Sequence, residues 1–124
     1  MGIHESGENY LETILLLSRK NDAVRSVDIV NELEISRPSV SKAMGILKND
    51  GLISIDRSGF ITLTDEGETI AERIYERHRV ITELLVKIGV SEKTASEDAC
   101  KIEHDISVES FEAIKRHVAG KTNQ

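Results

Sequence analysis

Three side chains near the C-terminal end of the chain have the types and the spacing of metal ligands. Cys100, Glu103 and His104 offer a sulfur, a carboxylate and an imidazole, and Cys100 is the only cysteine in the sequence. Positions i, i+3 and i+4 share one face of an α-helix, so a helix here would bring the three groups to one point. Such a mixture of soft and hard donors suits a first-row divalent ion better than calcium or magnesium. The motif is short, so other residues must support it.

Candidate ligands at two other places support this site. His78 occupies a core-facing position of a long helical pattern, where isoleucine or leucine is expected. A buried histidine with an ordinary hydrogen-bond partner would also explain it. Asn9 and Glu12 share a face of the first predicted helix, where a solvated polar edge is an equally good explanation. If that helix packs across the later two, these residues would complete a site of nitrogen, oxygen and sulfur ligands.

The composition limits the kind of protein. The chain has 124 residues, of which 39% are hydrophobic and 3% aromatic, with one proline. We therefore predict a small folded protein that is rich in helices and packed by aliphatic side chains. One cysteine cannot close an internal disulfide, and we find neither a secretory signal nor an apolar run long enough to cross a bilayer. These features predict a cytoplasmic protein with no membrane partner.

Hydrophobic periodicity predicts six helices and one β-hairpin. The expected helices cover residues 8–19 (with Ser6 as an alternative start), 26–33, 36–51, 64–89, 91–104 and 107–120. The buried side of the third is expected to be Val40, Met44 and Leu47. Five of the expected helices begin with a serine or threonine, and for four of these the side-chain oxygen is predicted to cap the free N–H groups of the first turn. These residues are Ser26, Ser36, Thr64 and Ser107. After Gly51 the period changes to about 2, which predicts strands at 52–56 and 60–63 joined by a turn at 57–59.

This order of elements is that of a winged helix-turn-helix. In that fold the second helix of the pair enters the major groove of DNA, and the hairpin, or wing, touches an adjacent groove or the backbone. The predicted DNA-binding residues are Ser36, Arg37, Pro38, Ser39, Ser41 and Lys42 in the helix and Arg57 and Ser58 in the wing. A lysine can reach a guanine edge or a phosphate, and small residues allow close approach to a thymine methyl group.

The predicted fold class is mainly α, with two domains. A winged helix-turn-helix DNA-binding domain at residues 1–63, whose first helix also contributes to the metal site, precedes a helical metal-binding and dimerisation domain at residues 64–124. The net charge of −6 opposes binding to phosphates. However, residues 25–60 carry equal numbers of acidic and basic groups, and most of the excess acid lies in residues 61–124. Bound divalent cations would cancel part of that charge.

Nearly the whole chain resembles the N-terminal part of the diphtheria-toxin-repressor family, which includes the manganese transport regulators. Five motifs in order carry the resemblance, at residues 9–12, 36–41, 63–67, 77–79 and 98–107. It implies a homodimeric repressor that binds a two-fold symmetric operator in double-stranded DNA more tightly when Fe(II) or Mn(II) is bound. We expect a short form without the small SH3-like domain of longer members.

The resemblance also implies a set of ligands of mixed type. Cys100, Glu103 and His104 match the core ligands of the family, and a cysteine at position 100 is typical of its iron-type members. Glu12 matches a manganese-type ligand, and His78 matches a ligand of a second ion in both branches. The family pattern thus implies one or two ions per subunit: one at Asn9, Cys100, Glu103 and His104, and a second at Glu12, His78 and Glu103.

Departures from the family pattern leave the identity of the metal ion undecided. Asn9 stands where the iron branch has methionine and the manganese branch aspartate, and Thr82 and Ser96 stand where iron-type members have ligands of the second ion. Cys100 favours Fe(II) and also suits Zn(II), Co(II) or Ni(II), whereas Asn9 and Glu12 favour the harder Mn(II). Fe(II) and Mn(II) both remain, with Fe(II) slightly favoured.

Apolar faces of the last two predicted helices are assigned to a dimer interface, because they exceed what one thin layer needs. Their residues are Ala95, Ala99, Ile102, Ile106, Phe111, Ile114 and Val118. One alternative is a winged-helix transcription regulator that does not respond to metal and has a hydrophobic pocket instead. Another is a metal-dependent hydrolase, but the sequence has no second carboxylate pair, phosphate-binding loop or nucleophile with its base. We therefore expect no enzyme.

Overall fold

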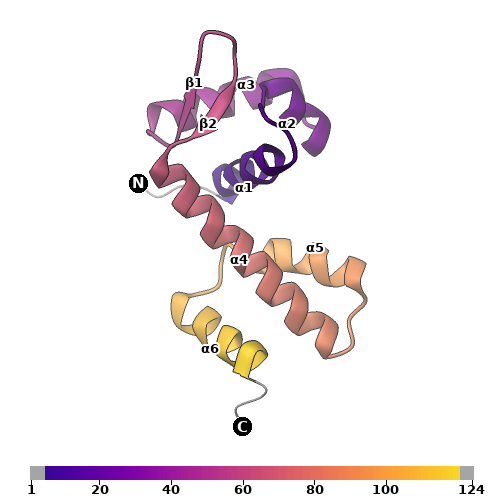
Figure 1. The fold of residues 1–124 in the computed structure, drawn as a ribbon. Coiled ribbons are helices and arrows are strands. Elements are labelled where there is room, and N and C mark those ends of the chain that lie inside the picture. The colour runs from indigo at the N-terminus through magenta and orange to yellow at the C-terminus, as the bar shows by residue number, and fades with distance from the viewer. Residues whose placement is uncertain (1–4, 121–124) are drawn as a thin grey trace. The chain divides into compact units, whose positions relative to one another are not determined.

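The computed structural model describes residues 5–120, with side chains from residue 7 onward. Its helices are α1 (Glu5–Lys20), α2 (Ser26–Leu33), α3 (Arg37–Asn49), α4 (Asp65–Lys87), α5 (Glu92–Ile102) and α6 (Val108–Ala119), and its strands are β1 (Ile53–Ile55) and β2 (Ile61–Leu63) (Figure 1). The mainly α class and the order of a winged helix-turn-helix are confirmed. The chain divides inside α4 into two compact units, residues 1–72 and 73–124. Within residues 5–120, no helix is long and apolar enough to cross a bilayer.

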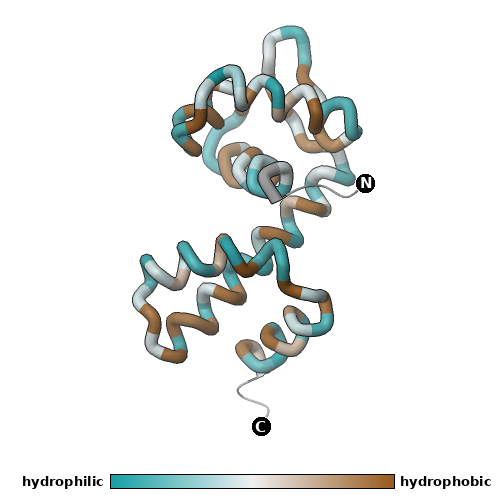
Figure 2. The backbone as a smooth tube through the Cα atoms, turned by 180° about the vertical axis from the view of Figure 1, so that it is seen from behind, coloured by the Kyte–Doolittle hydropathy of each residue, from teal (hydrophilic) through white to brown (hydrophobic). Residues whose placement is uncertain are grey.

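The first unit has its core between α1, α2, α3 and the hairpin. Apolar side chains repeat at helical spacing, so each helix turns one face toward the others. Figure 2 shows the resulting alternation of hydrophobic and hydrophilic residues along the chain. The most deeply buried side chains are Leu11, Ile14, Val24, Ile29, Val40 and Met44. Each helix thus buries one face, although in α2 only Ile29 is fully buried and Val27 is 39% exposed.

Three of the four predicted N-caps are confirmed. The side chains of Ser36, Thr64 and Ser107 each accept a hydrogen bond from the N–H three residues further on, at 3.3, 3.1 and 3.0 Å. The prediction for Ser26 is wrong, because α2 is capped by Arg25 and Ser26 is its first helical residue. The carboxylate of Asp28, inside the first turn of the helix, accepts a hydrogen bond from the N–H of Arg25 at 2.8 Å, so the backbone N–H of the capping residue has a partner.

The wing is a two-stranded antiparallel hairpin. Ile53 pairs with Leu63, Ser54 with Thr62 and Ile55 with Ile61. Both strands are shorter than predicted, because the residues next to them form the turn. Asp56 Oδ1 accepts hydrogen bonds from the N–H groups of Ser58 and Phe60, each at 2.9 Å. This carboxylate holds the tip of the wing in shape.

A close backbone contact fixes the start of α4 against the wing. The Thr64 hydroxyl donates to the carbonyl of Gly51 at 2.8 Å, and the Thr64 N–H donates to the carbonyl of Leu52 at 3.0 Å. A Cβ atom at Gly67 would lie 2.0 Å from the Leu52 carbonyl oxygen. Only glycine permits this approach, which explains the Leu63-Thr64-x-x-Gly67 motif.

In the second unit, the faces assigned to a dimer partner are mostly used by the chain itself. Four of the seven predicted interface residues are buried: Ala95 and Ala99 at 0% exposure, Phe111 at 3% and Val118 at 6%. Their assignment to a dimer interface is wrong, because this chain already covers them. The large hydrophobic side chains exposed in this unit are Val86, Ile88, Ile102 and Val108.

Candidate functional site

Three predicted ligands come together in the second unit. His78 in α4, Cys100 in α5 and Glu103 directly after α5 offer ligand atoms that all lie within 4.8 Å of one another. His78 Nδ1 lies 2.9 Å from Glu103 Oε1 and 3.9 Å from Cys100 Sγ. A first-row ion needs donors that converge on one point about 2 Å from each, and these three are close to that arrangement.

The Glu103 carboxylate is the most unusual group of the cluster. Its side chain is fully buried. Its Oε2 has no hydrogen-bond partner among the residues that the structure describes, although His104 Nε2 lies 3.5 Å away. A buried carboxylate with an unsatisfied oxygen costs free energy unless a cation balances it. A divalent ion beside a thiol and two imidazoles would supply that charge, so the residues present fit a metal.

The grouping of ligands differs from the one expected from helical spacing. The helix was predicted to continue through His104, but α5 ends at Ile102 and residues 103–105 form a turn. The predicted helix is therefore two residues too long, and Glu103 and His104 lie in the turn that follows it. His78 from α4 occupies the position beside the thiol instead, while His104 faces the other oxygen of Glu103.

His78 is held by groups on both sides of its ring. The pKa of His78 rises from 6.5 to about 10, first because of the hydrogen bond to Cys100 and next because of that to Glu103, while burial opposes the rise. Without a bound metal, His78 is therefore protonated near neutral pH. A metal must displace this proton, because only the neutral imidazole is a ligand.

Two residues with hydroxyl groups, Ser96 and Thr82, line the same groove as His78. Ser96 Oγ lies 3.2 Å from His78 Nε2, so the residue that stands where iron-type members have a ligand of the second ion does lie beside His78. Thr82 Oγ1 is buried without a hydrogen-bond partner among the described residues. The groove has a volume of about 610 Å³, is open to solvent, and is also lined by Arg79, Glu83 and Val86.

Asn9 and Glu12 lie in the first unit. Both are in α1, three residues apart, and both are half-buried. Their part in metal binding stays a prediction.

The predicted DNA-binding residues form two exposed groups in the first unit. Arg37, Pro38, Ser39, Ser41 and Lys42 lie in the first turns of α3 and are all exposed, as is the cap Ser36. The Ser36 hydroxyl donates to Ser39 Oγ at 2.9 Å, so these two side chains are partly engaged within the protein. Arg57 and Ser58 lie at the exposed tip of the wing. The buried face of α3 consists of Val40, Met44 and Leu47, as predicted.

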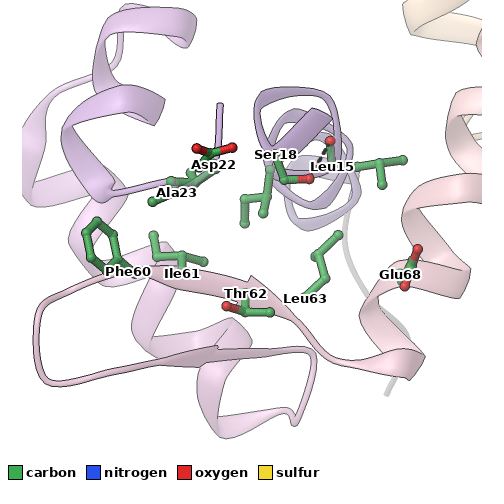
Figure 3. A pocket seen from close by; sticks show the side chains of 11 residues that line it. Leu15, Ser18, Asp22, Ala23, Phe60, Ile61, Thr62, Leu63 and Glu68 are labelled. Carbon is green, nitrogen blue, oxygen red and sulfur yellow. Dashed lines mark hydrogen bonds between the residues drawn. The ribbon is translucent and has the colours of Figure 1, made fainter. Parts of the chain in front are cut away.

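A cavity of about 330 Å³ lies in the first unit beside α1 and β2 (Figure 3). Ile14, Leu15 and Ile61 form part of its apolar wall. Its polar lining residues are Ser18, Asp22, Thr62 and Glu68, and all four are exposed. Water can solvate these polar groups, so nothing in the cavity demands a ligand in the way that the buried Glu103 carboxylate does.

Comparison with known proteins finds two family models that match successive parts of the chain. Residues 3–59 match the family described as iron dependent repressor, N-terminal DNA binding domain. Residues 64–121 match the family described as iron dependent repressor, metal binding and dimerisation domain. The first match covers α1 to β1 and ends before β2, and the second covers α4 to α6, which carry the metal-ligand cluster.

Individual relatives of this chain are also transcriptional regulators. The transcriptional regulator MntR of Escherichia coli is 35% identical over 108 residues, which are 87% of this chain and 70% of that protein. An uncharacterised HTH-type transcriptional regulator of Methanocaldococcus jannaschii is 35% identical over 113 residues, 90% of each chain. The structure of the manganese regulator SloR superposes with a TM-score of 0.82 at 25% identity, covering 96% of this chain and 55% of that one. This chain thus spans about half the length of SloR. It belongs to the iron-dependent repressor family, whose members are metal-dependent transcriptional regulators and not enzymes.

Proposed function

We propose that this chain binds operator DNA as a homodimer when it is loaded with Fe(II) or Mn(II), and that it thereby regulates metal homeostasis. The observation that carries the proposal is the buried Glu103 carboxylate, which faces His78 and His104 and has an oxygen without a hydrogen-bond partner among the described residues. Without metal, protonated His78 lies beside one oxygen of Glu103, and a divalent ion that displaces this proton would balance the carboxylate and also offer a partner to the second oxygen.

The metal ligands in this proposal are His78, Cys100, Glu103 and His104. Glu103 has an imidazole near each of its oxygens, so its carboxylate is suited to bridge two ions as well as to hold one. Asn9 and Glu12 are added on the strength of the family resemblance. One or two ions per subunit are consistent with this set.

The choice of ion follows from the donors. Cys100 is a soft ligand and favours Fe(II), while the oxygens of Glu103, Glu12 and Asn9 accept Mn(II). The similarity to a manganese regulator supports Mn(II) as a candidate ion alongside Fe(II). Zn(II), Co(II) and Ni(II) would bind more tightly than Mn(II) in the test tube by the general order of affinity.

The proposed mechanism is linkage between metal binding and DNA binding. A bound ion supplies positive charge to ligands from separate elements. His78 on α4 and Glu103 after α5 can share that charge in only some arrangements of the chain, so metal occupancy selects among those arrangements. If the favoured arrangement suits successive major grooves, a coupling of about 1–3 kcal/mol would raise operator affinity about 5–150-fold.

The second candidate is a winged-helix regulator that does not respond to metal. The cavity beside α1 and β2 is the feature that would serve it. It is the weaker candidate, because the polar residues of that cavity are exposed. A small organic ligand would gain little there by replacing water.

Anaerobic titration of metal-stripped protein with Fe(II), Mn(II) and Zn(II) tests the proposal. Binding to labelled DNA from upstream of its own gene is followed by fluorescence anisotropy, and the mass of the protein by sedimentation. We expect a dimer and a metal-dependent rise in DNA affinity, with the order of effective ions deciding between iron and manganese. Tight DNA binding that ignores all three ions would favour the second candidate.

A further inference from the structure

Arg77 is a buried basic residue directly before His78 in α4. It is 8% exposed, and its Nη1 donates to the carbonyl oxygens of Glu103 at 3.0 Å and of Ile106 at 2.9 Å. Its guanidinium carbon lies 5.3 Å from the centre of the Phe111 ring in α6, within the range of a cation–π contact. One side chain therefore ties α4 both to the turn after α5 and to α6.

These hydrogen bonds fix the segment that follows α5, since Glu103 and Ile106 both lie beyond the last residue of that helix. Here α5 ends at Ile102, and both N–H groups of Arg77 Nη1 are directed to carbonyls of the turn that follows. The direction of the Glu103 and Ile106 peptide groups is thereby fixed relative to α4.

Two consecutive residues of α4 thus hold Glu103 in two ways. Arg77 binds its main-chain carbonyl, and His78 binds its carboxylate at 2.9 Å. The buried charge of Arg77 is costly, because its Nε has no hydrogen-bond partner among the described residues. An aliphatic side chain would fill the same space without that cost.

We propose that Arg77 is a positioning residue of the metal centre. By fixing the main chain at Glu103, it sets the carboxylate beside His78 and Cys100 before a metal arrives. The inference depends on the proposed function, because it assumes that this cluster binds a divalent ion. Contacts that orient a metal ligand in this way are typically worth about 10–100-fold in metal affinity.

Anaerobic Co(II) titration of the metal-stripped chain tests this role. The visible absorption of Co(II) reports its geometry, and the thiolate-to-cobalt band reports its bond to Cys100. The unaltered chain is compared with Arg77→Met, Arg77→Lys and Lys115→Met. The last variant is the matched control, because Lys115 Nζ pairs with Glu76 Oε2 at 2.7 Å and so joins α4 to α6 on the exposed surface, away from the turn.

We expect Arg77→Met to bind Co(II) about 10–100-fold more weakly and with an altered thiolate band. The Co(II) affinity of Arg77→Lys should lie between those of Arg77→Met and the unaltered chain, because an ammonium group keeps the charge and can still donate a hydrogen bond to a carbonyl. Lys115→Met should bind as the unaltered chain does. If Arg77→Met does not fold, the comparison of Arg77→Lys with Lys115→Met decides.

Val118→Ala separates positioning from stability, since Val118 is a core residue of α6. This variant should lower the Tm and keep the Co(II) affinity and spectrum. An equal loss of Co(II) affinity in Val118→Ala and Arg77→Met would overturn the inference. Unaltered Co(II) affinity in a folded Arg77→Met would overturn it too. If Arg77→Met does not fold, unaltered Co(II) affinity in Arg77→Lys would have the same consequence. If the unaltered chain does not bind Co(II), the proposed function fails as well, so the two failures can be told apart.

Discussion

His78 and Glu103 lie 25 residues apart in the sequence, yet the imidazole Nδ1 is 2.9 Å from a carboxylate oxygen of a fully buried side chain. This contact joins α4 to the end of α5. The thiol of Cys100 also lies near this imidazole nitrogen, and His104 lies near the second carboxylate oxygen. The contact between His78 and Glu103 is therefore the centre of the proposed metal site. The predictions below test that site and the fold that positions it.

Replacing the buried carboxylate by an amide should greatly weaken metal binding. Glu103→Gln keeps the shape of the side chain and removes the charge that would balance a divalent ion. Glu97→Gln makes the same change at an exposed position of α5 and is the control. We expect Co(II) affinity to fall about 10-fold or more in Glu103→Gln, as for other contacts of a metal site, and to stay constant in Glu97→Gln. A competing chelator measures both, and equal affinities would contradict the site.

Metal affinity should rise with pH between about 6 and 8. The pKa of His78 is raised to about 10, so the imidazole holds a proton throughout this range and must release it to ligate a metal. Raising the pH removes the competing proton, with an expected gain of about tenfold in affinity per pH unit for each proton released. Chelator competition at several pH values measures the slope. His78→Asn should bind more weakly with a shallower slope, and a flat profile for the unaltered chain would contradict the assignment.

The two substitutions Gly67→Ala and Gly45→Ala should have opposite effects on stability. A Cβ at Gly67 would lie 2.0 Å from the Leu52 carbonyl oxygen, whereas a Cβ at Gly45 meets nothing within 4 Å. We expect Gly67→Ala to lower the free energy of unfolding by about 1–3 kcal/mol, since the backbone must shift. Gly45→Ala, in the middle of α3, should raise it by about 0.5–1 kcal/mol. Urea denaturation measures both, and an unchanged stability of Gly67→Ala would contradict the tight junction.

The wing should contribute to DNA affinity through charge. Arg57 lies exposed at the tip that Asp56 holds in shape. If Arg57 contacts a phosphate, Arg57→Ala should weaken binding to all DNA sequences alike and reduce the salt slope by about 1. Arg116→Ala removes the same charge from an exposed position of α6 and should leave the slope unchanged. Anisotropy titrations at several salt concentrations measure this, and equal slopes for the two variants would rule out the contact.

Local sequence signals were sufficient to predict the first unit. The burial of Val40, Met44 and Leu47 followed from helical spacing, and the wing followed from the change of period after Gly51. Such signals depend on neighbours along the chain, so they are visible without a structure. The cap of α2 was the exception, because Asp28 satisfies the N–H of Arg25 in place of a serine side chain.

The arrangement around the metal cluster could not be predicted in this way. No proline or glycine lies within the residues directly after Ile102, so hydrophobic periodicity alone predicted that the helix continues to His104. The segment after α5 is instead held by hydrogen bonds from Arg77 to carbonyls that are 26 and 29 residues away in the sequence. For the same reason the ligand set was found from residue types, while the pairing of Cys100 with His78 required the structure.

The most direct test compares DNA binding by the unaltered chain and by Glu103→Gln, each with and without metal. Fluorescence anisotropy of labelled upstream DNA is measured anaerobically with metal-stripped protein and then with added Fe(II) or Mn(II). Our account predicts that metal raises the affinity of the unaltered chain about 5–150-fold and leaves Glu103→Gln unchanged. Equal DNA affinity of the unaltered chain with and without metal would contradict it.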